Sequence, residues 1–192
     1  METIELQSLA KNKNYYTKPM SAMHSFYLHD VEPADEYIEW FEQIRHSGPN
    51  DVVKIHINSY GGDLFSAIQF MRVLQESEST VIASVEGACM SAATMIFLQA
   101  DAFEISEHSM FMFHNYSGGT FGKGGEMLDQ LRHEREWSEK MMRAVYEDFL
   151  TQKEVDAMLD NKDIWMDGDE VVKRLEKKAK KVRRNARVEN NS

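Results

Sequence analysis

The alternation of apolar and polar residues predicts strands that are each followed by a helix. Residues 53–57 place an apolar side chain at every second position, which is the spacing of a half-buried strand. A glycine-containing turn at 58–63 follows, and apolar residues then recur at helical spacing over 64–74. The same order of strand, turn and helix recurs at 81–99. This pattern predicts an α/β fold of parallel βαβ units, in which ligands bind at the carboxyl ends of the strands.

The rest of the chain adds short strands and further helices. We expect strands at 25–28, 103–106 and 110–113, and helices that begin after Pro33, at Glu126, at Val155 and after Asp167. The stretch 126–150 has no Gly or Pro and predicts one helix, which at about 1.5 Å per residue would reach beyond a small domain. Its far end is therefore expected to pack against another subunit. Thr151 with Glu154, and Asp167 with Glu170, can cap the last two helices.

Length and charge indicate one acidic domain with appendages. The 192 residues suffice for one full core, which we place at 25–175 between an N-terminal arm (1–24) and a basic C-terminal tail (176–192). The net charge is −10, but residues 173–192 hold nine Lys and Arg against two Glu, so residues 1–172 hold −17. An acidic body argues against a nucleic-acid-binding core. Nucleic-acid binding through the tail alone stays an alternative, although the tail has no aromatic residue to stack on bases.

Several classes of protein are disfavoured by what the sequence lacks. A single cysteine, Cys89, excludes an internal disulfide and suits a reducing compartment. No apolar run has the length of a membrane span, and the first residues lack the features of a signal peptide, so we expect a cytoplasmic protein. There is no cysteine pair and no His-Glu-x-x-His sequence, and the Gly122-Lys123 pair lacks the neighbours that a phosphate-binding loop needs. We expect neither a metal nor a cofactor.

Ser91 lies where a predicted buried strand becomes a predicted buried helix, within the segment Gly-Ala-Cys-Met-Ser-Ala-Ala at Gly87–Ala93. A serine at the start of a helix is most often only a cap. The same position also places it beside free backbone N–H groups and the positive end of the helix dipole, which can stabilise the oxyanion of acyl transfer. Ser91 is therefore a candidate nucleophile as well as a candidate cap.

A serine nucleophile needs a base, and the base usually needs a carboxylate to orient it. Of the seven histidines, only His114 ends a predicted buried strand and opens a glycine-rich loop, where a side chain can stand at the mouth of a pocket. The residues alone leave the acid open among four candidates: Asp160, Asp163, Asp167 and Asp169.

Four segments, taken in order, resemble the proteolytic subunit of the Clp protease family. They are Ile55–Gly62, Gly87–Ala93, Met112–Asn115 with Gly118-Gly119 after it, and Asp163–Met166. The similarity covers about residues 25–175, which become a peptidase domain in this interpretation. The resemblance implies a crotonase-like superhelix of repeated βαβ units with a protruding helix at about 126–150. It also implies a serine endopeptidase that hydrolyses peptide bonds in unfolded polypeptides inside a chamber of one or two stacked rings of seven subunits.

By the same resemblance, Ser91, His114 and Asp163 form the catalytic triad, and the backbone N–H groups of Gly62 and Ala92 form the oxyanion hole. An ATP-driven unfoldase is a further partner that the family suggests, although the N-terminal arm does not clearly match the loops that engage one. Tyr60 stands where the family usually has proline, and Ala92 where it often has methionine; neither change removes a backbone N–H. With the basic tail, these departures resemble divergent members found in phages, which would act in the host cytoplasm.

Two other interpretations stay open. A crotonase-like enzyme could act on an acyl thioester, with Gly62 and Ala92 polarising its carbonyl and no serine chemistry. Alternatively, the chain is a catalytically silent ring subunit or an assembly scaffold that uses the basic tail as a docking arm.

Overall fold

The computed structural model describes the backbone of residues 20–189 and the side chains of residues 20–180. Residues 1–19 of the predicted arm and the last three residues of the predicted tail lie outside the described residues. The strands are β1 (Met23–Val31), β2 (Val52–Gly62), β3 (Thr80–Met90), β4 (Ala102–Ile105), β5 (Met110–Phe113) and β6 (Ile164–Asp167). The helices are η2 (Ala34–Tyr37), α1 (Ile38–Arg45), α2 (Leu64–Glu76), α3 (Ala92–Phe97), α4 (Gly124–Tyr146), α5 (Gln152–Leu159) and α6 (Gly168–Glu189).

The described strands form one six-stranded sheet with the order β1-β2-β3-β5-β6, and β4 pairs with β3 outside this path. Pairing is parallel throughout, except that β6 is antiparallel to β5. β3 is long enough to pair residues 82–85 with β4 and residues 88–90 with β5. Helices join β1 to β2, β2 to β3 and β3 to β4, which confirms the predicted α/β fold of βαβ units. The carboxyl ends of β2, β3 and β5 therefore meet at one edge of the sheet.

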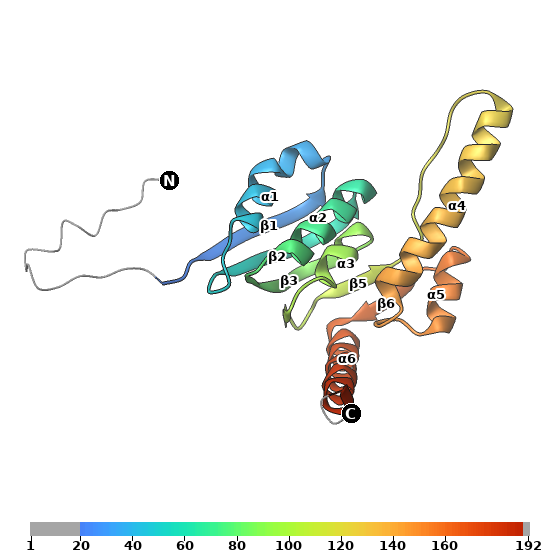
Figure 1. The fold of residues 1–192 in the computed structure, drawn as a ribbon. Helices are drawn as coiled ribbons and strands as arrows, with labels where there is room; N and C mark the ends of the chain where they lie inside the picture. The colour runs from blue at the N-terminus through green and yellow to red at the C-terminus, as the bar shows by residue number, and fades with distance from the viewer. Residues whose placement is uncertain (1–19, 190–192) are drawn as a thin grey trace, which may run out of the picture.

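The core lies between the sheet and helices α1, α2 and α3, which cover one face of it (Figure 1). The strand alternation predicted at 53–57 is confirmed, because Val53, Ile55 and Ile57 are buried while the residues between them are only partly covered. On the other face, the ammonium group of Lys54 lies 2.7 Å from the carboxylate of Glu104. Among the helices of residues 20–189, none combines the length and apolar character needed to cross a membrane.

α4 is the long helix that the sequence predicts, but it ends at Tyr146 rather than at residue 150. The carbonyl oxygen of Tyr146 accepts hydrogen bonds from the N–H groups of Phe149 and Leu150, whose side chains are both buried. The ring of Phe149 packs against that of Phe113 in β5, with centroids 5.3 Å apart. Packing these side chains against the core turns the chain out of the helix, so the predicted end is wrong by four residues.

Two further features differ from the sequence pattern. β2 continues through the expected glycine turn to Gly62, which pairs with Val31 of β1. The sequence pattern also does not predict the short strand β6 (Ile164–Asp167). This strand forms through its ladder with β5, in which Phe113 lies opposite Ile164.

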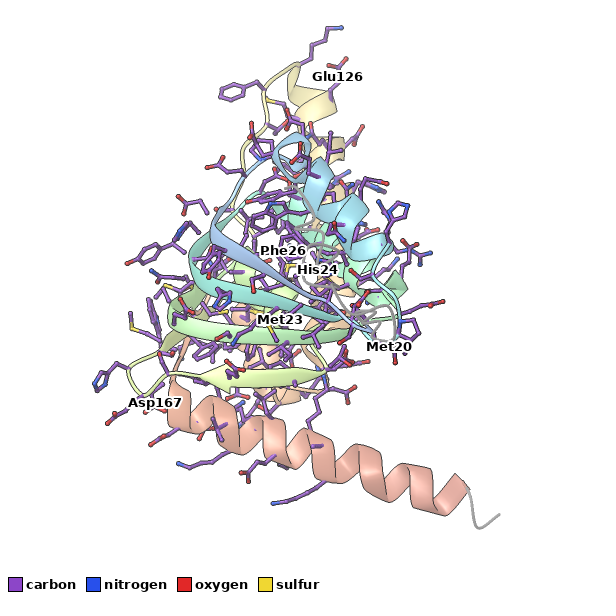
Figure 2. All side chains as sticks on the ribbon, turned by 90° about the vertical axis from the view of Figure 1, so that its left-hand side faces the viewer. Met20, Met23, His24, Phe26, Glu126 and Asp167 are labelled. Atoms are coloured by element: carbon purple, nitrogen blue, oxygen red, sulfur yellow. The ribbon has the colours of Figure 1, made fainter. Side chains whose placement is uncertain are left out.

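α6 begins where the sequence places a cap, since the Asp167 carboxylate accepts a hydrogen bond from the N–H of Glu170 at 2.8 Å. The capping box of Thr151 and Glu154 at the start of α5 is likewise confirmed. α6 runs on without interruption through the boundary at 175/176 and extends beyond the sheet (Figure 2). Glu126, near the start of α4, lies at the opposite end of the molecule from Asp167 (Figure 2). The division into arm, domain and tail stays a prediction.

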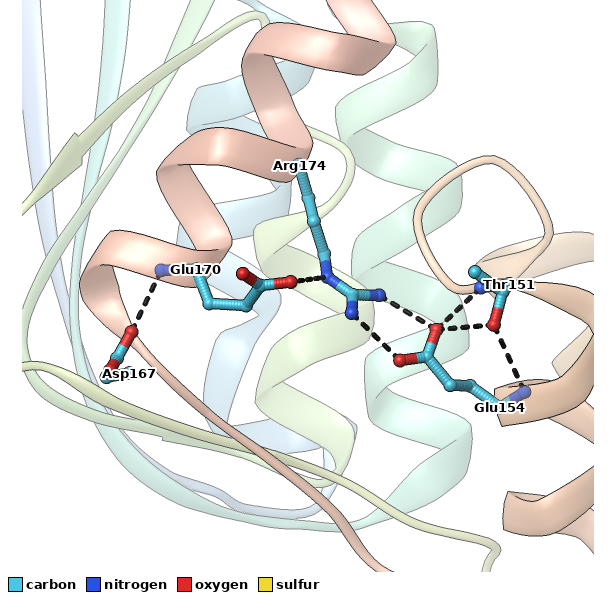
Figure 3. Close-up of polar contacts among 5 residues, drawn as sticks. All are labelled: Thr151, Glu154, Asp167, Glu170 and Arg174. Atoms are coloured by element: carbon cyan, nitrogen blue, oxygen red, sulfur yellow. Dashed lines mark hydrogen bonds and ion pairs between the residues drawn. The ribbon is translucent and has the colours of Figure 1, made fainter.

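Arg174 of α6 forms a bidentate ion pair with Glu154 of α5 (Figure 3). Its two terminal nitrogens each lie 2.8 Å from an oxygen of Glu154, and its Nε lies 2.7 Å from Glu170. The same Glu154 carboxylate accepts hydrogen bonds from the N–H and hydroxyl of Thr151. These donors, Arg174 foremost, lower the pKa of Glu154 from 4.5 to about 2. The contact also raises the pKa of Arg174.

We expect Glu154→Gln to lower the free energy of unfolding at pH 7 by about 1–2 kcal/mol, because charged hydrogen bonds are lost. The folded-state pKa lies below the unfolded one, so this stabilisation is present above pH 4.5 and is lost as the pH falls toward 2. Denaturant unfolding at pH 7 and pH 3 should therefore show a gap between wild type and variant that narrows at pH 3. Glu176→Gln is the matched control, since its pair with Lys180 on the same helix is exposed and 3.7 Å long. An equal loss in both variants, or a gap independent of pH, would contradict this account.

Candidate active site

Three chain segments bring four of the five predicted site residues to one edge of the sheet. Gly62 ends β2, Ser91 and Ala92 lie at the junction of β3 and α3, and His114 directly follows β5. All four line one cavity of about 570 Å³. This is the edge where the carboxyl ends of the parallel strands meet, and it agrees with the general position of ligand sites in such sheets.

Ser91 has a backbone conformation that is rare for a residue with a side chain, with φ 54° and ψ −129°. Its N–H donates to the carbonyl oxygen of Met112 at 2.8 Å, which ties the turn to the end of β5. Within the described part of the chain, its side chain makes no capping hydrogen bond to α3. Ser91 thus occupies the N-cap position of α3, but its hydroxyl does not cap the helix and can make another contact.

That contact is with His114. The Ser91 Oγ lies 2.5 Å from Nε2 of His114, and both side chains are partly buried. In the neutral tautomer with the proton on Nδ1, Nε2 accepts a hydrogen bond from the Ser91 hydroxyl group. A serine hydroxyl bonded to an imidazole nitrogen is the arrangement that activates a serine for nucleophilic attack.

Asp163 is not brought into contact with His114. Its side chain is exposed and makes no hydrogen bond or ion pair within residues 20–180. Its backbone is nevertheless close, because the antiparallel ladder ends at the pair of Phe113 and Ile164, and the next step would place His114 opposite Asp163. Side chains at directly opposed positions have Cβ atoms about 5 Å apart.

The other candidate acids have different surroundings. Asp167 is occupied as the cap of α6. Asp160 lines a second cavity of about 810 Å³, formed between α4, α5 and the loop after His114. Asp169 is exposed in the first turn of α6.

Two glycines of β2 give the site its close packing. A side chain at Gly62 would overlap the carbonyl oxygen of Val31. At Gly61, whose φ is 101°, a Cβ atom would stand 2.6 Å from the Cβ of Ser91 and 3.1 Å from the nitrogen of Ala92. Gly61 thus sets how near β2 approaches the serine. Sequence reasoning assigned a role to Gly62 and missed Gly61, although the Gly-Gly pair was the available signal.

Gly62 pairs with Val31 of β1 and also lines the cavity. The N–H of Asp63, the next residue, donates to the carbonyl oxygen of Val31 at 2.6 Å. Gly62 thus shares the cavity with Ser91 and Ala92, which follow β3.

The walls of the cavity are residues that sequence reasoning also missed. Phe65 of α2 and Trp137 of α4 stack at its side, with ring centroids 5.7 Å apart. Met95, Met142 and Tyr146 add apolar surface, and His133 and Glu134 add polar groups. Their positions in three helices far apart in sequence gave no pattern from which the cavity could be predicted.

The remaining reactive groups lie elsewhere. His56 bonds the carboxylate of Glu86 at 2.6 Å and stacks on Tyr27, with centroids 4.4 Å apart. Burial raises the pKa of the Cys89 thiol, so this cysteine is a poor nucleophile. Among the described residues, no group of three or more His, Cys, Asp or Glu side chains is arranged to hold a metal ion.

Comparison with known proteins identifies the family. The family model of the Clp protease matches residues 28–174, from β1 into the first turns of α6. A search of curated proteins finds no match to this chain. The matched span covers most of the chain and includes Ser91, His114 and Asp163. It confirms the resemblance and the crotonase-like α/β fold that the four segments implied. The chain belongs to the Clp protease family.

Proposed function

We propose that this member of the Clp protease family is a serine endopeptidase that cleaves unfolded polypeptide in an oligomeric chamber. Membership in the family gives a peptidase role. The serine mechanism rests on one observation, which is the 2.5 Å contact between Ser91 Oγ and His114 Nε2 at the wall of the cavity. Ser91 attacks the peptide carbonyl while His114 takes its proton, and His114 then passes that proton to the leaving amine.

Asp163 is proposed as the acid that orients His114. Its backbone continues the ladder toward His114, so a change of side-chain rotamer could bring the carboxylate to the Nδ1 proton. There it would hold the imidazole in the required tautomer and stabilise the imidazolium that forms during attack. Asp163 follows α5 and precedes an edge strand, where a neighbouring subunit could fix its rotamer.

The backbone amides of Gly62 and Ala92 are proposed as the oxyanion hole. Both residues line the cavity beside Ser91. Two fixed N–H donors aimed at the developing negative charge need no reorganisation when it forms, which is why such donors lower the barrier.

The substrate and the assembly follow from the cavity and from α4. A cavity of about 570 Å³ with apolar walls has room for peptide side chains beside Ser91. In the first half of α4, Leu128 and Leu131 are 51% and 47% exposed, which suits contact with another subunit. The family generally forms rings of its own subunits; a heptamer or double heptamer is our proposal for this chain. A cytoplasmic location and an unfoldase partner are proposals of the same kind.

The proposed mechanism is tested by labelling with a fluorophosphonate, which reacts with activated serines. We expect a single adduct on Ser91 of the wild type, found by intact mass and peptide mapping, and none on Ser91→Ala. His114→Ala should slow labelling by at least about 10³-fold, because the general base is lost. Asp163→Asn should slow it less than His114→Ala does if the aspartate only orients the base.

His46→Ala is the control, since His46 is an exposed residue at the end of α1 and lies away from the cavity. Its labelling rate should match that of the wild type. If the well-folded, oligomeric wild type were not labelled by the fluorophosphonate, that result would contradict the serine mechanism. It would favour the silent ring subunit or the acyl-thioester enzyme.

A second prediction concerns Gly61. A Cβ atom there would push against Ser91 and Ala92, and φ 101° is itself unfavourable for alanine. We expect Gly61→Ala to lower the labelling rate of Ser91 by about 100-fold, because small misplacements of reacting groups have effects of that size. Gly48→Ala provides the comparison, since a Cβ at that position meets only an ordinary contact of 3.8 Å with Asp51. Wild-type labelling by a folded Gly61→Ala protein would show that Gly61 does not position the serine.

A further inference from the structure

Two buried hydroxyl groups connect α4 to the turn that holds Ser91. Thr94 in α3 is completely buried, and Tyr146 in the last turn of α4 is 1% exposed. Thr94 Oγ1 lies 2.7 Å from the hydroxyl of Tyr146 and 2.7 Å from the carbonyl oxygen of Ser91. Neither hydroxyl has a role in the mechanism described above.

The direction of both hydrogen bonds follows from the atoms. A carbonyl oxygen can only accept, so the hydroxyl of Thr94 donates its single proton to Ser91. The Thr94 oxygen must then be the acceptor in its bond with Tyr146, and Tyr146 must be the donor. Burial raises the pKa of Tyr146, so its hydroxyl keeps the proton that it donates. The chain of donation runs from Tyr146 through Thr94 to the carbonyl group of Ser91.

This carbonyl group shares a peptide unit with the N–H of Ala92. The unit is planar and trans, so fixing the direction of the Ser91 C=O also fixes the direction of the Ala92 N–H on the opposite side. The Ser91 oxygen already accepts the N–H of Thr94 at 2.9 Å as the first bond of the helix. The hydroxyl of Thr94 therefore adds a second bond to the same oxygen. Hydrogen bonds in a chain polarise one another, which makes the Ala92 N–H a better donor.

We propose that Thr94 and Tyr146 are positioning residues, which hold the peptide unit between Ser91 and Ala92 so that the Ala92 N–H faces the developing oxyanion. The proposal rests on the proposed serine mechanism. The need for support is evident in Ser91, whose backbone lies in a sparsely populated region that the surroundings must maintain. α3 has only six residues, so its own hydrogen bonds give limited support.

The hydroxyl of Tyr146 can be removed without removing its packing. The ring meets Phe113 edge to face, with centroids 5.7 Å apart, and Tyr146→Phe keeps that contact. Thr94→Val keeps the shape of the other side chain and removes its hydroxyl. Thr94→Ser keeps the hydroxyl and removes only a methyl group. These three variants separate the hydrogen-bond chain from apolar packing.

The test measures saturation kinetics of a fluorophosphonate on the full chain. In this reaction Ser91 Oγ bonds to phosphorus, fluoride leaves, His114 takes the proton, and negative charge develops on the phosphoryl oxygen near Ala92. We expect Tyr146→Phe and Thr94→Val each to lower the maximal labelling rate about tenfold, with half-saturation within about twofold of the wild type. Thr94→Ser should stay near the wild-type rate. The double variant should be no slower than Thr94→Val, because both residues act through one chain.

Tyr37→Phe is the matched control for loss of a buried tyrosine hydroxyl. Tyr37 donates to the carbonyl oxygen of Asp30 at 2.7 Å, packs against Phe41 of α1 and Phe70 of α2, and does not line the cavity. It should lose thermal stability to a similar extent as Tyr146→Phe and label at the wild-type rate. If Tyr146→Phe fails to fold, the comparison of Thr94→Val with Thr94→Ser decides alone.

The outcomes separate this inference from the proposed function. A labelled wild type with wild-type rates in both Tyr146→Phe and Thr94→Val would overturn the positioning role and leave the serine mechanism intact. Slow labelling of Thr94→Ser, equal to that of Thr94→Val, would also overturn it, since packing would then be the cause. A wild type that is not labelled at Ser91 would overturn the serine mechanism and this inference with it.

Discussion

The strained backbone of Ser91 is the constraint on which the rest of the site depends. Ser91, with φ 54°, lies at the junction of β3 and α3, and its side chain contacts His114 there. Such a conformation persists only where neighbouring groups hold it from several sides. Here β5 accepts the N–H of Ser91 through Met112, and Thr94 donates twice to its carbonyl oxygen. Gly61 gives room at the remaining side, because any side chain there would occupy the space of the serine.

The two ends of α4 have different surroundings. Its last turns bury Met142 and Tyr146 beside the cavity, and Tyr146 reaches the serine turn through Thr94. Its first turns extend beyond the body of the domain and leave Leu128 and Leu131 exposed (Figure 1). A continuous helix of 23 residues is a stiff element. The helix therefore connects its exposed end rigidly to the end that borders the site.

The sequence predicted those parts that depend on local pattern. The βαβ order, the junction at Ser91, the strand before His114 and both capping sites follow from periodicity and residue type. The walls of the cavity could not be predicted in this way, because Phe65 and Trp137 belong to helices that lie far apart in the sequence and meet only through their side chains. The end of α4 was misplaced for a related reason, since burial of Phe149 and Leu150 overrides good helix-forming sequence. Gly61 was visible in the sequence, but its contact with Ser91 arises from the approach of two strands.

The separation of Asp163 from His114 follows from how each member of the proposed triad is held. Ser91 and His114 follow β3 and β5, which are paired neighbours inside the sheet, so their contact is set by the same ladder. Asp163 follows α5 and precedes β6, a strand of four residues at the edge of the sheet. A short edge strand fixes its backbone through few hydrogen bonds and leaves an adjoining side chain open to solvent. The serine and histidine are thus positioned by the fold of one chain, whereas the proposed acid lies where an additional contact is needed to fix its rotamer.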